Sequence, residues 1–185
     1  MACEFSGIER DAFAAKGHDA WSCDLLPTER PGQHIQDDVL KHLDDGWDLM
    51  IAHPPCVHLA VSGAPHFKNK ADVQMKALEF VQQLLAAPIH KIALENPVSI
   101  ISTRIRRPDQ IIQPYMFGHV ERKTTCLWLK GLSKLRETCN VKAQFDLLPE
   151  NKKNPRHYLP PSKDRWKLRS LAYQGIAQAM ADQWG

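Results

Sequence analysis

The chain has 185 residues, of which 43% are hydrophobic and 24% charged, and its formal net charge is +3 at pH 7. This balance excludes a disordered chain, and the length suits a single domain, residues 1–185, with a core of its own. No apolar run approaches the roughly 20 residues that a membrane helix needs, and no leader opens the chain, so we expect a cytoplasmic protein without a membrane partner.

Apolar residues alternate between strand-like and helix-like spacing along the chain, and glycine or proline ends most of these segments. In chain order they predict a strand end and turn at 5–7, a helix over 8–15, strands over 20–24 and 47–52, a helix over 70–86, strands over 91–94 and 126–129, and a helix over 170–184. The alternation predicts an α/β domain whose mostly parallel sheet carries helices on both faces.

Polar and reactive side chains follow several of these predicted strands. In parallel sheets, ligands bind at the carboxyl ends of the strands. The residues that fall at this edge are Glu4 to Gly7, Asp24, Asp38, His53 to Cys56 and Glu95 to Pro97. We therefore expect them to converge on one rim although they are distant in sequence.

Cys56 follows two prolines at the end of a predicted strand, where a stiff backbone would hold its thiol over the rim. The five cysteines form no paired framework, so we expect reduced thiols and consider Cys56 a nucleophile, with a buried inert cysteine as the alternative. His53 and His58 nearby raise the question of zinc. The zinc deaminase pattern needs a second cysteine and a His-x-Glu that are both missing, so we expect no metal.

Three carboxylates are placed to contact a ligand at the same rim. Glu95 ends the strand over 91–94 and would share a pocket with Cys56, unless it caps a helix or pairs with an arginine. Asp24 and Asp38 stand where acidic side chains accept hydrogen bonds from the ribose hydroxyls or the amine of a nucleoside. Ordinary turn chemistry is the alternative for both aspartates.

The charges are segregated along the chain. Residues 1–103 hold 8 Lys and Arg against 14 Asp and Glu, whereas residues 104–169 hold 16 against 6. A basic block with interspersed Trp128, Tyr158 and Trp166 could hold phosphates and stack an unpaired base, although a solvated surface and core tryptophans would give the same composition.

Taken together, these residues resemble the DNA cytosine carbon-5 methyltransferases, and the chain looks like a short phage-type member of that family. The matching blocks, in family order, are Phe5-Ser6-Gly7-Ile8, Asp24, Asp38-Val39, Pro54-Pro55-Cys56 and Glu95-Asn96. The resemblance covers residues 3–98, with weaker matches over 120–131 and 170–184. A reduced basic region, residues 132–165, stands in place of the family's large target-recognition domain.

The resemblance implies a Rossmann-like methyltransferase fold, S-adenosylmethionine as cofactor, and methyl transfer to carbon 5 of cytosine in DNA through a covalent cysteine adduct. It makes Cys56 the nucleophile and Glu95 the group that hydrogen-bonds or protonates ring nitrogen 3. The cofactor-binding residues it implies are Phe5, Ser6, Gly7, Asp24, Asp38, Val39 and Pro54. The substrate-binding residues are Asn96, Arg122 and Lys123, and the location is the cytoplasm of a bacterial or phage-infected cell.

Two departures from the family pattern leave alternatives open. Glu9 and Arg10 stand where the family continues with glycine, which favours a non-catalytic DNA-binding or protein-binding relative that lost its cofactor turn. A base-reading surface typically buries upwards of about 600 Å² of protein, more than residues 132–165 readily supply. The substrate is therefore duplex DNA, a single strand or a free nucleotide, and a partner or second copy that completes the recognition surface is left open.

Overall fold

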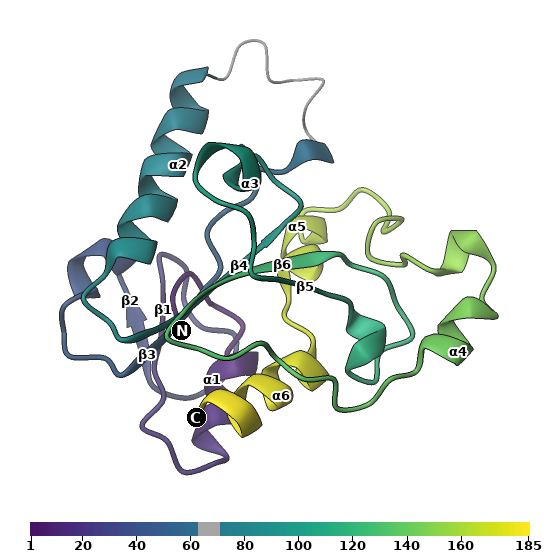
Figure 1. The fold of residues 1–185 in the computed structure, drawn as a ribbon, viewed down its shortest axis with the longest axis horizontal. Coiled ribbons are helices and arrows are strands. Elements are labelled where there is room, and N and C mark those ends of the chain that lie inside the picture. The colour runs from purple at the N-terminus through teal and green to yellow at the C-terminus, as the bar shows by residue number, and fades with distance from the viewer. Residues whose placement is uncertain (63–70) are drawn as a thin grey trace.

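A central β-sheet with helices on both faces forms the protein, a computed structural model that describes residues 1–62 and 71–185 (Figure 1). On one side, β1 (Ser22–Asp24) and β2 (His34–Gln36) form a parallel pair. The other strands follow the order β3-β4-β6-β5. Their bounds are β3, Leu49–Ala52; β4, Lys91–Pro97; β5, Gln110–Ile112; and β6, Thr125–Lys130.

The first residues of the chain join the two strand groups. Ala2 forms parallel bridges to Cys23 in β1 and to Ala52 in β3. Its amide donates to the carbonyl of Ile51 at 2.7 Å, and its carbonyl accepts from the amide of His53 at 2.9 Å. The strand order thus runs outward from this segment, to β1 and β2 on one side and to β3 and β4 on the other. The segment is therefore a topological switch point, and α/β proteins bind ligands at such points.

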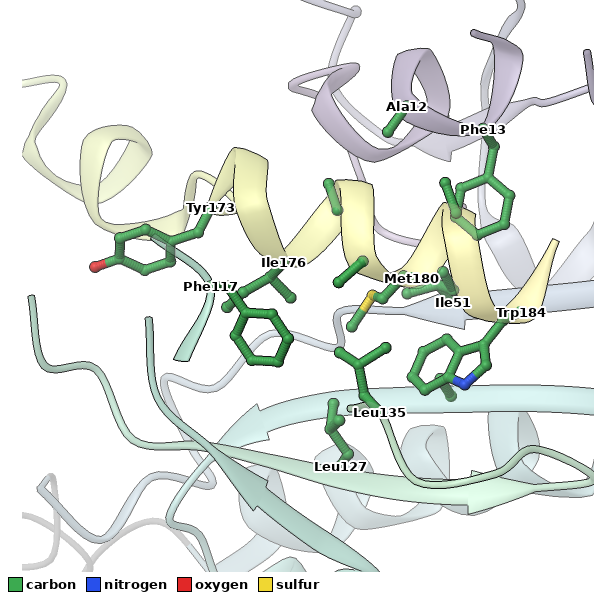
Figure 2. Close-up of a cluster of buried hydrophobic side chains, with 14 of the residues drawn as sticks. Ala12, Phe13, Ile51, Phe117, Leu127, Leu135, Tyr173, Ile176, Met180 and Trp184 are labelled. Carbon is green, nitrogen blue, oxygen red and sulfur yellow. The ribbon is translucent and has the colours of Figure 1, made fainter. Parts of the chain in front are cut away.

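Side chains alternate across the sheet, so each face has a core of its own. On one face, Ile51 and Leu127 pack with α1 (Ile8–Ala14) and α6 (Gln174–Trp184). Figure 2 shows α6 running between α1 and the strand that carries Leu127. On the other face, Leu94 and Trp128 belong to the cluster that α2 (Ala71–Ala86) and α3 (Ile101–Arg104) complete.

The α/β prediction is confirmed, but the prediction of a mostly parallel sheet is wrong beyond β4. The strand expected over 126–129 is β6, which is antiparallel to both β4 and β5, because the chain reverses after β5 and returns between them. Further short helical segments are η1 (Val39–His42), η3 (Pro114–Met116), α4 (Lys142–Asp146), η4 (Glu150–Lys152) and α5 (Arg165–Ser170).

Two predicted helices differ from the structure at their starts. The helix expected over 170–184 is divided, because the backbone is extended at Leu171 and Tyr173 between α5 and α6. The helix expected over 70–86 is α2, and its first predicted residue lies outside the described residues. Among the helices described in 1–62 and 71–185, none has the length and apolar character needed to cross a membrane.

Candidate functional site

Hydrogen bonds tie the loop that carries Cys56 to the strand that carries Glu95. The side-chain amide of Asn96 donates to the carbonyl of Pro54 at 2.9 Å. Just after the cysteine, the carbonyl of Leu59 accepts from the amide of Ile100 at 2.9 Å. The position of Cys56 relative to β4 is therefore set by bonds on both sides of the thiol.

The Cys56 thiol lies at the surface and is not activated in this structure. The residue is exposed, yet partial desolvation by neighbouring atoms and the negative charge of Glu95 raise the pKa of its thiol. The positive charges of Lys123 and Arg169 lower that pKa but do not outweigh the increase. A nucleophilic role therefore needs a bound substrate that accepts electrons as the sulfur attacks.

Glu95 forms an ion pair with a histidine that also contacts a second glutamate. Its Oε2 lies 3.0 Å from Nδ1 of His53, and Nε2 of His53 contacts Oε2 of the buried Glu9. Burial alone would raise the pKa of Glu95, but His53 and the charge of Lys123 lower it to about 2. The Glu95 side chain, 18% exposed, is therefore a carboxylate at neutral pH.

Of the predicted substrate residues, only Lys123 acts on both reactive groups. Its charge lowers the pKa values of Cys56 and Glu95. Arg122 instead pairs with Glu150. Asn96 is 1% exposed, and in this structure its side-chain amide holds the Cys56 loop, so its predicted role in substrate binding stays a prediction.

A basic residue that the sequence analysis did not single out also acts on the thiol. Arg169 lies in α5, more than a hundred residues from Cys56 in sequence, and its charge lowers the pKa of Cys56. The only sequence signal for it was the general surplus of lysine and arginine over residues 104–169.

A cleft of about 510 Å³ lies beside the Cys56 loop, at the carboxyl ends of β1 and β2. Three predicted cofactor residues, Asp24, Asp38 and Val39, line it, and Pro55 connects it to Cys56. Its other lining residues include the apolar Leu25, Ala77 and Phe80. The volume lies within the range of roughly 300–1,000 Å³ that small-molecule sites occupy.

Both aspartates keep acceptor oxygens at this cleft while also stabilising turns. One oxygen of Asp24 accepts from the amide of Leu26 at 2.9 Å, and one oxygen of Asp38 caps η1 through the amide of Leu40 at 3.0 Å. Each carboxylate has a second oxygen. Two carboxylates that accept hydrogen bonds can bind the hydroxyls and the amine of an adenine nucleoside, and the apolar wall can contact its flat ring. The residues that line the cleft therefore suit S-adenosylmethionine.

The other four predicted cofactor residues do not line this cleft. Phe5 is buried, and its ring lies 5.9 Å from that of Trp166 in α5. Ser6 accepts from the amide of Ile8 at 3.2 Å, and Gly7 adopts a φ of 75° that permits the turn into α1. Pro54 is buried, and its carbonyl is bonded to Asn96.

Glu9 and Arg10, the residues that break the family's glycine pattern, are each 1% exposed and do not line the cleft. The Arg10 guanidinium donates to Thr28 at 3.1 Å and to the carbonyls of Arg30 and Pro31, each at 3.1 Å. Arg10 therefore holds the loop after β1 in place, while Glu9 contacts His53.

A larger cavity, about 700 Å³, lies at the opposite, amino-terminal ends of the strands. Trp21, Trp47 and Trp184 are among the residues that line it, and Val39 is the one predicted site residue among them. Across the described parts of the chain, no three His, Cys, Asp or Glu side chains are arranged to hold a metal ion. The smaller cleft, next to Cys56, is therefore the candidate site.

The electrostatic coupling between Glu95 and Cys56 can be tested by alkylation. In a Glu95→Gln variant the pKa of the Cys56 thiol should fall, because a neighbouring negative charge is removed, and iodoacetamide should modify Cys56 roughly threefold faster or more at neutral pH. Lys123→Met should have the opposite effect. Mass spectrometry of the Cys56 peptide measures the rate, and the exposed Cys139 in the same sample is the internal control. Equal Cys56 rates in the three proteins would contradict the coupling.

Neither a protein-family model nor a curated protein matches this chain. Its function is therefore inferred from the chemistry of the site. The features available for that inference are the Cys56 thiol, the Glu95 carboxylate with its histidine, the nearby cations and the nucleoside-sized cleft.

Proposed function

We propose that the chain is a methyltransferase that modifies carbon 5 of cytosine in DNA and uses S-adenosylmethionine. One observation carries the proposal: the Cys56 loop is bonded to the strand of Glu95, and Lys123 acts on both residues beside a nucleoside-sized cleft. A thiol, a carboxylate and a cation that act on one another match what attack on a pyrimidine ring requires.

The fold is proposed to be a Rossmann-like methyltransferase fold. Support comes from the parallel pairs β1–β2 and β3–β4 and from the switch point at Ala2, which is followed by Cys3 in the wall of the cleft. The antiparallel β6 is a departure from an all-parallel sheet, at a distance from the switch point.

The cleft is proposed to hold the cofactor, which supplies the methyl group. Asp24 would accept from the ribose hydroxyls, and Asp38 with Val39 would hold the adenine. Phe5, Ser6 and Gly7 would shape the turn next to the cofactor from their positions before α1. The acidic character of residues 1–103 favours a ligand with positive charge at this end of the molecule.

Cys56 and Glu95 would carry out the covalent chemistry on cytosine. Carbon 5 is a poor nucleophile until the Cys56 thiolate adds to carbon 6 and converts the ring into an enamine. Glu95 would hydrogen-bond or protonate ring nitrogen 3, so that the charge that develops in the ring is neutralised as sulfur adds. Carbon 5 then takes the methyl group, a base removes its proton, and the thiolate leaves.

DNA is the proposed substrate because cations surround the reactive side of the sheet. Lys123 and Arg169 act on the thiol, and Trp166, which shares α5 with Arg169, is 52% exposed. Residues 132–165 hold only the short segments α4 and η4, a small surface for reading bases. Low sequence specificity, or a partner that adds recognition surface, is therefore part of the proposal.

The burial of Glu9 and Arg10 weakens the case for a non-catalytic relative. Neither residue lines the cleft. The Arg10 side chain hydrogen-bonds to the loop after β1 and does not occupy the space proposed for the cofactor. The substitutions that motivated that alternative are thus compatible with a cofactor in the cleft.

Incubation with tritium-labelled S-adenosylmethionine tests the proposal. We expect label in the cytosine of DNA, as duplex or single strand, and none in deoxycytidine monophosphate or in DNA that lacks cytosine. Label in the free nucleotide alone would move the substrate class to nucleotides. No label in any of these, together with no binding of the cofactor by calorimetry, would contradict the proposed function.

A further inference from the structure

His53 is held between two carboxylates, one on each ring nitrogen. Nδ1 lies 3.0 Å from Oε2 of Glu95, and Nε2 contacts Oε2 of Glu9. An ionised carboxylate only accepts hydrogen bonds, so each ring nitrogen must carry a proton. The arrangement therefore holds an imidazolium at the end of β3, directly before the Cys56 loop.

Several other titratable groups lie around this imidazolium and its two carboxylates. Glu4 acts on it from the segment before α1, and Lys123 acts on Glu95 from the segment just before β6. The amino group of Met1 acts on Glu4 and Glu9, and Cys56 faces Glu95 from the loop. Burial lowers the pKa of His53, but the charges and hydrogen bonds of Glu9 and Glu95 outweigh it and raise the pKa to about 10.

The chemistry proposed for Glu95 needs a proton that Glu95 itself does not hold. With a pKa of about 2, the carboxyl is ionised at neutral pH. An ionised carboxylate has nothing to donate to ring nitrogen 3 as the sulfur adds. The proton on Nδ1 of His53 belongs to an acidic group and is already directed at Glu95.

We propose that His53 is the proton source for Glu95, and that Glu9 is the positioning residue that keeps His53 charged and correctly oriented. This inference rests on the proposed function. Because Glu9 retains the proton on Nε2, the proton that leaves His53 is the one on Nδ1. Neither His53 nor Glu9 needs to touch the substrate.

The proton transfers balance over the reaction. The thiolate pair forms the sulfur bond to carbon 6, the ring π electrons shift toward nitrogen 3, and nitrogen 3 takes a proton through Glu95 from Nδ1 of His53. After carbon 5 has taken the methyl group and lost its proton to a base, sulfur leaves with its bonding pair. Nitrogen 3 then returns its proton through Glu95, and His53 is a cation again.

The test combines a pH profile with a direct measurement of the histidine. If the active protein needs a Cys56 thiolate and a protonated His53, kcat/KM for DNA is bell-shaped and its optimum is the mean of the two pKa values. Glu9→Gln keeps the size and an acceptor but removes the charge, so the pKa of His53 should fall by on the order of one unit or more. The rising limb should remain, because Glu95, Lys123 and Arg169 are the charges that act on Cys56.

We therefore expect the optimum of Glu9→Gln to move to lower pH by half the fall in His53 pKa that nitrogen-15 histidine NMR records. His53→Gln should lower kcat roughly 10²- to 10⁴-fold and leave cofactor binding by calorimetry within about twofold. The matched controls are Glu79→Gln and His90→Gln, both exposed and outside the site, which should keep the wild-type profile.

Each contrary outcome overturns a different statement. An active wild type whose optimum is unchanged in Glu9→Gln, or whose His53 is neutral at pH 7 by NMR, overturns the inference and leaves the proposed function standing. A purely structural role predicts a uniform loss at all pH values with no shift, and that result also overturns it. No methyl transfer by the wild type to any cytosine substrate overturns the proposed function and this inference together.

Discussion

Replacement of Cys56 by alanine is expected to abolish methyl transfer and to prevent covalent capture by DNA that contains 5-fluorocytosine. The sulfur forms the bond to ring carbon 6, and alanine has no atom that can replace it. With the wild type, fluorine at carbon 5 blocks the final proton removal, so the adduct should accumulate. Intact-protein mass spectrometry measures the adduct, and tritium transfer measures turnover.

The variant should fold normally, because the loop is held by its backbone. The carbonyl of Cys56 accepts from the amides of Leu59 and Ala60 at 3.0 and 2.8 Å, which alanine preserves. Cys139→Ala is the matched control, since Cys139 is also exposed and lies outside the site. Cys3 lines the cleft but cannot replace Cys56, because burial raises the pKa of the Cys3 thiol to about 12. An adduct in Cys56→Ala would refute the assignment of the nucleophile.

Glu95→Gln is expected to lower kcat by roughly 10²- to 10⁴-fold, or about 3–5 kcal/mol of activation free energy. Glutamine keeps the shape of the side chain but cannot pass a proton to ring nitrogen 3. The variant should at the same time make the Cys56 thiol more reactive, because its pKa falls when the neighbouring charge is removed. Single-turnover tritium transfer, compared with the alkylation rate of Cys56, measures both effects in one protein.

The opposite signs of these two effects make the experiment selective. A variant that had lost its folded structure would also transfer methyl groups more slowly and would expose Cys56 to alkylation. Such a variant would lose cofactor binding as well, which distinguishes it from the expected result. Glu79→Gln, on the exposed surface of α2, is the matched control for the substitution itself. If Glu95→Gln transferred methyl groups at the wild-type rate, the carboxyl would have no part in the chemistry.

Local sequence patterns predicted much of the scaffold. The strands that contain Cys23, Ile51 and Leu94 follow from short apolar segments ended by proline or an acidic residue, and α2 follows from helical spacing. The segments β2, β5 and α3 were not predicted, because each is only three or four residues long and has at most one buried residue, whereas the equally short β1 and β3 are mostly buried. The direction of β6 was also beyond prediction, since periodicity carries no information about pairing.

The candidate site was predicted in part. Cys56, Glu95, Asp24 and Asp38 were identified because each was expected at the carboxyl end of a strand, and these ends meet at one edge of a sheet. Asn96 was assigned to the substrate because the Glu95-Asn96 pair resembles a family motif. Its bond to the carbonyl of Pro54 was not predicted, because the two residues are 42 positions apart in the chain.

By itself, the sequence determined the strands, the residues at their carboxyl ends and the segregation of charge, because these depend on neighbours in the chain. Only the tertiary structure decided what surrounds those residues. It joined Glu9, His53 and Glu95 across more than eighty positions and brought Lys123 and Arg169 near Cys56. The physical reason is that hydrogen bonds, desolvation and Coulomb interactions depend on distance in space, and three-dimensional packing alone establishes those distances.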